Sequence, residues 1–217
     1  MTEFEAVYAR HSVRSYMDKK IEDEKVQQLQ ALIQEVNAQG NLHLQFIADA
    51  GKTFNRLLNK FMGLGSAPSV IACVGKDDET LDERIGYYGQ KIVLAAQQLG
   101  LNTCWAGTFN AKNVSAQIDA DERLVIVIAI GYGATQGKVR RSKNPQDVCE
   151  EFSSAPAWFQ RGIETALLAP TAINQQKFKI ALASDGSVSY QDLGGVFSKV
   201  DLGIVKYNFE VGANSEK

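Results

Sequence analysis

The strongest constraint on the fold of this 217-residue chain is an apolar run over residues 123–130. After Arg123 it reads Leu-Val-Ile-Val-Ile-Ala-Ile, and β-branched residues of this kind favour a strand. Consecutive strand side chains point to opposite faces, so this run is apolar on both of them. We therefore expect a central strand in a sheet that is covered on both sides.

Hydrophobic periodicity predicts two long helices before this strand. Apolar residues recur at helical spacing over residues 22–39 and 82–99, and Gly40 and Gly100 end the two patterns. Small residues in the second helix predict that it packs closely against another backbone; they are Gly86, Gly89, Ala95 and Ala96.

Shorter apolar segments predict the other elements. In chain order these are strands at 42–48, 69–75 and 101–105, a long connection over 131–156, a helix at 157–168, a hairpin of residues 178–183 and 188–190 around Asp185-Gly186, and a short helix or turn followed by a strand near 207–211. Strands and helices alternate without strict βαβ order. This favours an α+β fold with a mixed sheet over a doubly wound one.

Composition limits the class of protein. The length fits one domain or two small ones packed as a unit, and 45% hydrophobic with 22% charged residues is typical of a globular chain. A net charge of −2 argues against nucleic-acid binding. The spacing of Cys73, Cys104 and Cys149 argues against a disulfide framework, and Cys73 fits a core thiol. Without a signal sequence or a membrane-length apolar segment, we expect a cytoplasmic protein with no membrane partner.

Several common functional motifs are incomplete. Gly51-Lys52-Thr53 lacks the first glycine of a phosphate-binding loop, because Phe46 occupies that position. The glycine pairs at 63 and 65 and at 131 and 133 lack the third glycine of a dinucleotide motif. His11 and His43 have no partners at metal-ligand spacing, so no metal site is expected. If the chain is an enzyme, a cofactor is expected to supply its chemistry.

Residues 10–14 read Arg-His-Ser-Val-Arg and form a candidate binding segment. Two guanidinium groups and a hydroxyl, expected within one turn of the chain, suit phosphate oxygens and heterocycle carbonyls. A solvated turn with two surface arginines is the alternative.

Together with residues 10–14, three further segments resemble the nitroreductase family. They are residues 89–107, which fit its central helix and following strand; residues 127–133, followed by the basic segment 138–143; and residues 169–176, which read Ala-Pro-Thr-Ala-Ile-Asn-Gln-Gln. The resemblance implies an α+β nitroreductase-like fold, with a mixed but mainly antiparallel sheet flanked by helices. It also implies FMN held between two subunits, one giving the Arg-x-Ser-x-Arg segment and the other a Pro-Ser-x-x-Asn loop.

The order of these segments departs from the family pattern. The loop normally follows the first long helix, whereas here it appears at 170–174, near the other end of the chain. We therefore expect a compacted single-chain pseudo-dimer, monomeric or weakly dimeric. Its parts would be a half at 1–136, a basic linker at 137–156 and a smaller half at 157–217 that plays the role of the partner subunit.

The resemblance implies a set of flavin-contacting residues. The residues that would contact the phosphate, the ribityl chain and the pyrimidine edge are in the first segment and the basic segment: Arg10, His11, Ser12, Arg14, Lys138, Arg140 and Arg141. The residues that would contact the ring are at the strand end, with one amide upstream: Trp105, Ala106, Gly107, Thr108 and Asn59. The late loop would contact the flavin from the other side through Pro170, Thr171, Ala172 and Asn174.

Some of these residues have simpler interpretations. Asn174 fits a turn cap, Arg140 and Arg141 fit linker charges, and Trp105 fits the core.

The implied activity is an FMN-dependent oxidoreductase that takes hydride from NADH or NADPH and reduces a small acceptor such as a nitroaromatic or a quinone. Lys177 and Phe178 replace a Pro-Trp pair common after the family's loop. A flavin-binding protein without turnover, serving storage, sensing or interaction, is the alternative. A structural relic that binds no cofactor is a third interpretation.

Overall fold

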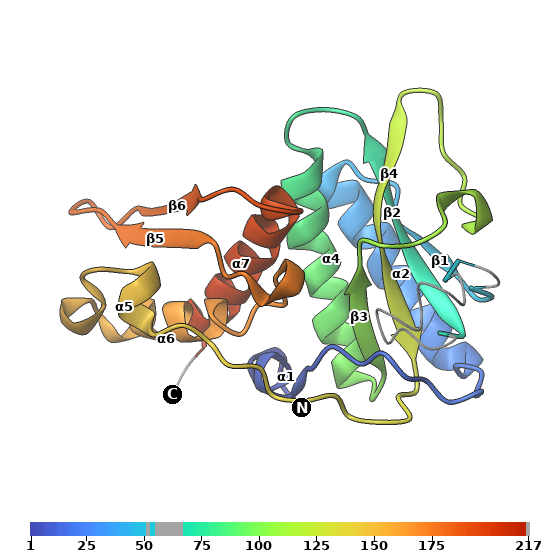
Figure 1. Ribbon diagram of the computed structural model, residues 1–217, viewed down its shortest axis with the longest axis horizontal. Helices are drawn as coiled ribbons and strands as arrows, with labels where there is room; N and C mark the ends of the chain where they lie inside the picture. The colour runs from blue at the N-terminus through green and yellow to red at the C-terminus, as the bar shows by residue number, and fades with distance from the viewer. Residues whose placement is uncertain (51–52, 55–66, 216–217) are drawn as a thin grey trace. The chain divides into compact units, whose positions relative to one another are not determined.

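The computed structural model describes residues 1–50, 53–54 and 67–215, which fold into two compact units (Figure 1). Unit 1 contains residues 1–9, 82–91 and 140–217, and unit 2 contains residues 10–81 and 92–139. The units are built from interleaved segments, whereas the sequence suggested consecutive halves.

Unit 2 is built on a four-stranded sheet. Its strands are β1 (Gln45–Ile47), β2 (Ser69–Lys76), β3 (Asn102–Ala106) and β4 (Glu122–Gly131), in the order β1-β2-β4-β3 with every neighbouring pair antiparallel. The predicted central strand is therefore confirmed as β4. Val127 and Ile128 point to opposite faces of the sheet and both are fully buried, so both faces are covered.

Helix α2 (Asp23–Gly40) packs beside β1 and confirms the first predicted helix. Asn41 ends it in the left-handed conformation (φ 48°), a backbone state that asparagine tolerates better than most residues. The Asn37 side chain then bonds both the N–H and the carbonyl of Leu44, at 2.8 and 3.0 Å, and so fixes the turn from helix to strand. A short 3-10 helix, η1 (Ala111–Asn113), follows β3.

Unit 1 is mainly helical, with one hairpin. In chain order it contains α1 (Glu3–Ala9), the part of α4 (Leu81–Gln98) that lies within residues 82–91, α5 (Pro145–Val148), the 3-10 helix η2 (Phe152–Ser154), α6 (Ala157–Ala166), the 3-10 helix η3 (Ala172–Asn174), β5 (Phe178–Leu182), β6 (Val188–Asp192) and α7 (Ser198–Ala213). The antiparallel pair β5–β6 confirms the predicted hairpin.

Glycines allow α4 and α7 to approach closely. A Cβ built on Gly86 would lie 2.0 Å from the Val200 carbonyl oxygen, and one on Gly203 would lie 2.0 Å from that of Glu83. Only a hydrogen side chain permits this separation at both positions. The prediction that small residues bring α4 against another backbone is confirmed at Gly86.

The strand predicted near 207–211 is wrong, because these residues lie in α7. Every residue from Val200 to Val205 is buried, so this part of the helix lacks the polar face that would reveal its period. The connection predicted over 131–156 is wrong in part. It contains α5, whose Val148 is fully buried, and the adjacent Cys149 is 4% exposed. Helix α1 was not predicted.

Candidate functional site

The Arg10–Arg14 segment is extended around Ser12 rather than turned. Ser12 forms a parallel bridge to Thr103 of β3, and the Val13 N–H donates to the Thr103 carbonyl at 3.0 Å. Extended side chains alternate, so Arg10, Ser12 and Arg14 share one face of the segment. Val13 is fully buried in the core of unit 2. The expectation of a single turn is therefore wrong. The alternation of Arg10, Ser12 and Arg14 with other residues reflects the geometry of a strand.

The other edge of this segment pairs with the chain that follows β4. Tyr16 forms an antiparallel bridge to Gly133, and the Met17 N–H donates to the Tyr132 carbonyl at 2.8 Å. Gly137, at φ +76°, comes so close that a Cβ there would lie 2.8 Å from the Cβ of His11. Lys138, the next residue, is thereby placed beside the arginine segment.

Positive charge gathers on this part of unit 2. Arg10 is half-buried, and burial lowers the pKa of its guanidinium to about 10, which leaves it cationic at neutral pH. Among the described residues, no carboxylate forms an ion pair with Arg14 or Lys138. Cations placed together in this way favour a phosphate or another anion as ligand.

The end of β3 belongs to the same region. Thr103 pairs with Ser12, and two residues later Trp105 is half-buried opposite Ile128 of β4. Ala106 is 1% exposed and lies in the core, while Thr108 is exposed. The sheet therefore brings the predicted strand-end residues 105–108 next to the arginine segment within unit 2.

Asn102 positions this region and was missed in the sequence. Its side-chain oxygen accepts a hydrogen bond from the Gly133 N–H at 2.9 Å, and its amide donates to Gln136 Oε1 at 3.2 Å. Asn102 is 7% exposed and so fixes the chain leading to Lys138 from inside the fold. A buried amide at the start of an apolar strand was the available signal.

The late loop, residues 170–176, lies in unit 1 and has an unusual backbone. Ile173, Asn174 and Gln176 have positive φ values of 47°, 58° and 45°. Asparagine tolerates this conformation, but Ile173 and Gln176 adopt it only where the surroundings impose it. Thr171 is buried, and its hydroxyl oxygen accepts a hydrogen bond from the Gln176 N–H at 3.1 Å.

Asp201 of α7 holds this loop and was also missed. Its carboxylate accepts hydrogen bonds from the Ala172 N–H at 2.9 Å and from the Gln175 side-chain amide at 2.7 Å. Burial raises the pKa of the Asp201 carboxyl to about 6, although both hydrogen bonds act in the opposite direction. The sequence signal for this role of Asp201 was its position as a single acidic residue inside the apolar run 200–205.

The loop also forms hydrogen bonds with part of the basic segment. The Asn174 amide donates to the Arg141 carbonyl at 2.9 Å, and the Lys143 ammonium donates to the Gln176 carbonyl at 2.7 Å. The side chain of Asn174 thus bonds residue 141, not the backbone of its own turn. Arg140 and Arg141 are exposed, and no described carboxylate forms an ion pair with either.

The predicted residues therefore form two sets. Unit 2 gathers the arginine segment, Lys138 and the strand end, and unit 1 gathers Pro170, Thr171, Ala172 and Asn174 with Arg141 and its neighbour Arg140. Asn59 lies outside the described residues.

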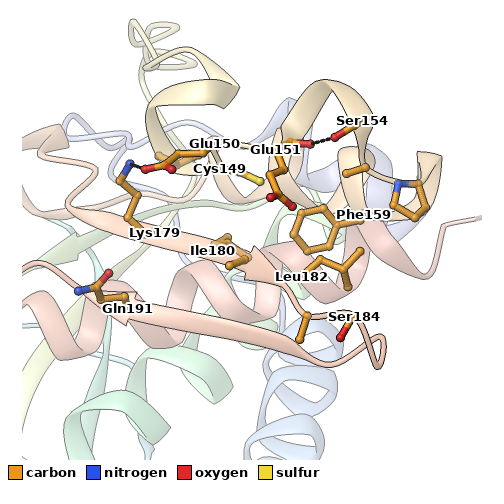
Figure 2. A pocket seen from close by; sticks show the side chains of 15 residues that line it. Cys149, Glu150, Glu151, Ser154, Phe159, Lys179, Ile180, Leu182, Ser184 and Gln191 are labelled. Carbon is orange, nitrogen blue, oxygen red and sulfur yellow. Dashed lines mark hydrogen bonds and ion pairs between the residues drawn. The ribbon is translucent and has the colours of Figure 1, made fainter.

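Unit 1 also contains a cavity of about 760 Å³ between β5 and the chain around α5 and η2 (Figure 2). Its walls include Val148, Cys149, Phe159, Ile180 and Leu182, with Glu150 and Lys179 paired at 3.8 Å. None of the residues that line it belongs to the predicted flavin set.

In the part of the chain that the structure describes, no helix is long and apolar enough to cross a membrane.

Comparison with known proteins gives one family. The family model described as "Putative TM nitroreductase" matches residues 3–213. A solved "putative nitroreductase" from Thermotoga maritima is 24% identical, with a TM-score of 0.68 over 98% of this chain and 83% of that one. No curated protein matches the chain significantly.

Two more distant solved structures share the fold. A "putative nitroreductase in complex with fmn" from Desulfovibrio desulfuricans is 23% identical, with a TM-score of 0.50 over 66% of this chain and 92% of that one. A "Putative NADH dehydrogenase/NAD(P)H nitroreductase" from Parabacteroides distasonis is 19% identical, with a TM-score of 0.52 over 67% and 95%. The predicted α+β nitroreductase-like fold is confirmed, and the chain belongs to the TM nitroreductase family of the matching model.

Proposed function

We propose that the protein is an FMN-dependent oxidoreductase that uses NADH or NADPH to reduce a small acceptor such as a nitroaromatic or a quinone. Membership of a nitroreductase family supports an oxidoreductase. The observation that carries the proposal is the extended Arg10–Arg14 segment, which aligns two cations and a hydroxyl on one face. One protein of the same fold is described as a complex with FMN.

The donor set of unit 2 fits the polar side of FMN. Arg10, Ser12 and Arg14 supply charge-assisted hydrogen bonds for the phosphate, the ribityl chain and the pyrimidine edge, with Lys138 as a further phosphate contact. His11 belongs to the same segment, and its Cβ faces the Gly137 backbone. The backbone of residues 105–108 would lie along the isoalloxazine ring, with Trp105 itself packed in the sheet.

The loop of unit 1 is proposed as the second set of contacts. Pro170, Thr171, Ala172 and Asn174 would approach the flavin from the other side, with Arg140 and Arg141 near the phosphate. The hydrogen bonds that the loop donates to Asp201 and to the Arg141 carbonyl support a preorganised loop, which lowers the entropic cost of binding. One chain would then do the work of two subunits, as a pseudo-dimer that is monomeric or weakly dimeric.

When bound, FMN would supply the redox chemistry, which is hydride uptake from the nicotinamide and transfer of two electrons to the acceptor. The protein needs to bind the ring, orient it and polarise its pyrimidine side. Arg14 suits this last task, because a fixed cation stabilises the negative charge that develops there.

Steady-state kinetics test this proposal. Initial rates are measured against NADH and NADPH at several fixed concentrations of a nitroaromatic and a quinone, with FMN-loaded protein. Because donor and acceptor would use one cleft in turn, double-reciprocal plots should be parallel. Tightly bound FMN with no turnover for either donor would instead favour a storage, sensing or interaction role.

A further inference from the structure

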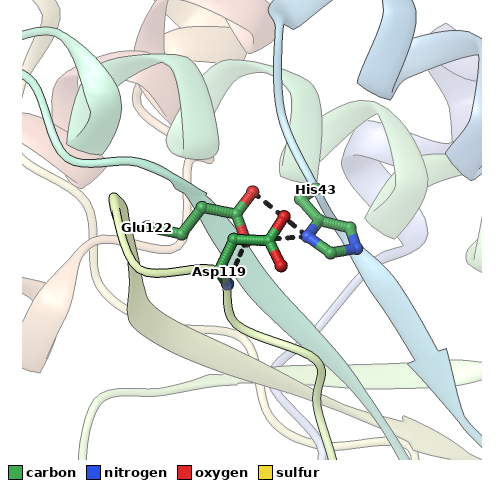
Figure 3. Close-up of side chains that lie close together, drawn as sticks. All are labelled: His43, Asp119 and Glu122. Atoms are coloured by element: carbon green, nitrogen blue, oxygen red, sulfur yellow. Dashed lines mark hydrogen bonds and ion pairs between the residues drawn. The ribbon is translucent and has the colours of Figure 1, made fainter.

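Three potential metal ligands converge in unit 2, although they are far apart in the sequence. His43 precedes β1, Glu122 begins β4, and Asp119 lies in the loop before β4. One ligand atom from each lies within 4.8 Å of the others. Figure 3 shows both carboxylates and the imidazole pointing toward one another. His43 and Glu122 are 79 positions apart, which explains why their spacing gave no metal signal.

Backbone pairing fixes two of these residues. The His43 N–H donates to the Val74 carbonyl at 2.9 Å, and neighbouring Leu42 bridges to Gly75, so His43 continues the sheet. Glu122 is the first residue of β4, and its N–H donates to the Asp119 carbonyl at 3.0 Å. Both ligands therefore project from rigid parts of the fold.

The loop that carries Asp119 is held from outside the cluster. The Gln45 side chain of β1 accepts a hydrogen bond from the Gln117 N–H at 2.8 Å and donates to the Gln117 carbonyl at 2.6 Å. This two-point contact fixes the loop two residues before Asp119. Preorganised ligands of this kind lose little entropy when an ion binds.

The electrostatics of the cluster favour a cation. The Glu122 side chain is only 13% exposed, yet it faces a second carboxylate. The cation next along the sheet, Lys76, is opposite Glu122 in the ladder but pairs with Asp121 at 3.4 Å. Glu122 Oε2 lies 2.8 Å from His43 Nδ1 and accepts a hydrogen bond from the Asp119 N–H at 2.9 Å. The imidazole that compensates this carboxylate is also a ligand for transition metals.

We propose that His43, Asp119 and Glu122 bind one divalent transition-metal ion, with Zn²⁺ as the best match. One imidazole nitrogen and two carboxylate oxygens form a mixed donor set that suits Zn²⁺ better than Mg²⁺ or Ca²⁺, which prefer oxygen ligands alone. Three protein ligands leave a fourth position for water. A simple ion pair between His43 and Glu122 is the competing explanation. It includes the Asp119 N–H, which donates to Glu122 Oε2 at 2.9 Å, but it gives the Asp119 carboxylate no role.

That difference defines the experiment. The FMN-loaded protein is titrated with Zn²⁺ by calorimetry at neutral pH, alongside Asp119→Asn and Asp121→Asn. The first variant removes one ligand but keeps the contact between His43 and Glu122. The second makes the same substitution at an exposed acid two residues away. We expect one ion per chain, with affinity reduced at least about tenfold by Asp119→Asn, in the range seen when a metal site loses a supporting group. Asp121→Asn should change it less than twofold.

A spectroscopic measurement locates the ion. Co²⁺ bound through His43 should give visible ligand-field bands that disappear in His43→Ala, with circular dichroism confirming that this variant is folded. If His43→Ala does not fold, paramagnetic broadening of the His43 ring resonances by Mn²⁺ in the unaltered protein replaces this measurement. Absence of binding at millimolar Zn²⁺, equal affinity in Asp119→Asn, or bands or broadening that do not involve His43 would each overturn the proposal.

Discussion

Arg10, Ser12 and Arg14 alternate with His11 and Val13 along an extended segment, and this alternation explains the pattern of residue types. Val13 points into the sheet core, so Arg10, Ser12 and Arg14 point to the opposite face, where each is half-buried. The role of the motif as a binding segment stays a prediction, and the single turn expected for it was wrong. Pairing with Thr103 involves residues about ninety positions away, and local spacing does not report such contacts.

Arg14→Gln should weaken FMN binding while leaving the fold intact. A charge-assisted hydrogen bond is worth about 1.5–3 kcal/mol, so the dissociation constant should rise about 10- to 100-fold. Fluorescence titration of FMN measures this. Lys20→Gln is the matched control, because Lys20 is exposed and forms a surface ion pair with Asp23. Equal loss in both variants would mean that overall charge, and not the segment, attracts the flavin.

Asp201→Asn should remove part of the pH dependence of stability. Burial raises the pKa of the Asp201 carboxyl to about 6 in the folded state, above its ordinary value of 3.8. The folded state therefore binds more protons than the unfolded state in this window, and stability rises as pH falls from 7 to 5. The wild type should gain about 1 kcal/mol more over this interval than the variant. Urea unfolding at both pH values measures the difference, and an identical gain in both proteins would contradict it.

At the level of elements, helix α4 and helix α7 depend on glycines where they cross in unit 1. A methyl group at Gly86 would overlap the Val200 carbonyl, which belongs to the backbone and cannot rotate away. The helices must then separate, and overpacking of this kind costs about 1–3 kcal/mol.

Gly86→Ala should therefore lower the free energy of unfolding by that amount, although alanine is the better helix former. Denaturant unfolding gives the value. Gln98→Ala, at an exposed position of the same helix, serves as the control and should change stability by less than about 0.5 kcal/mol. A stabilised Gly86→Ala protein would show that this crossing is looser than described.

The elements that the sequence predicted well are those with one buried face or with marked ends. Helix α2 has a polar face and ends at Gly40, and the β5–β6 hairpin has a glycine turn. Helix α7 was not predicted over its full length, because burial on all sides removed the hydrophobic periodicity that marks a helix. The roles of Asn102 and Asp201 were missed for another reason. Each forms hydrogen bonds with backbone groups about thirty residues away, which only the folded chain brings close.

At the level of the whole molecule, the sequence predicted the family and the α+β fold, because four separate segments resembled it. The sequence did not predict that residues 1–9 and 82–91 group with the C-terminal part, because α4 contributes to both units. The division into halves at 1–136 and 157–217 stays a prediction, as does the pseudo-dimer.

Sedimentation of the FMN-loaded protein tests the pseudo-dimer. If one chain supplies both sets of contacts, flavin absorbance should sediment with a species of 23.8 kDa, the mass of a single chain. FMN affinity should then not depend on protein concentration. Flavin found only in a species of twice that mass would mean that a second chain completes the site.

The central claim is that this chain binds FMN and turns it over with a nicotinamide, and one visible spectrum tests both parts. The purified protein is recorded without oxygen before and after NADH or NADPH, and again after a nitroaromatic or a quinone. We expect the absorption bands of oxidised flavin, their loss with at least one nicotinamide, and their return with the acceptor. A colourless protein whose melting temperature does not rise with added FMN, or flavin bands that neither nicotinamide bleaches, would contradict the account.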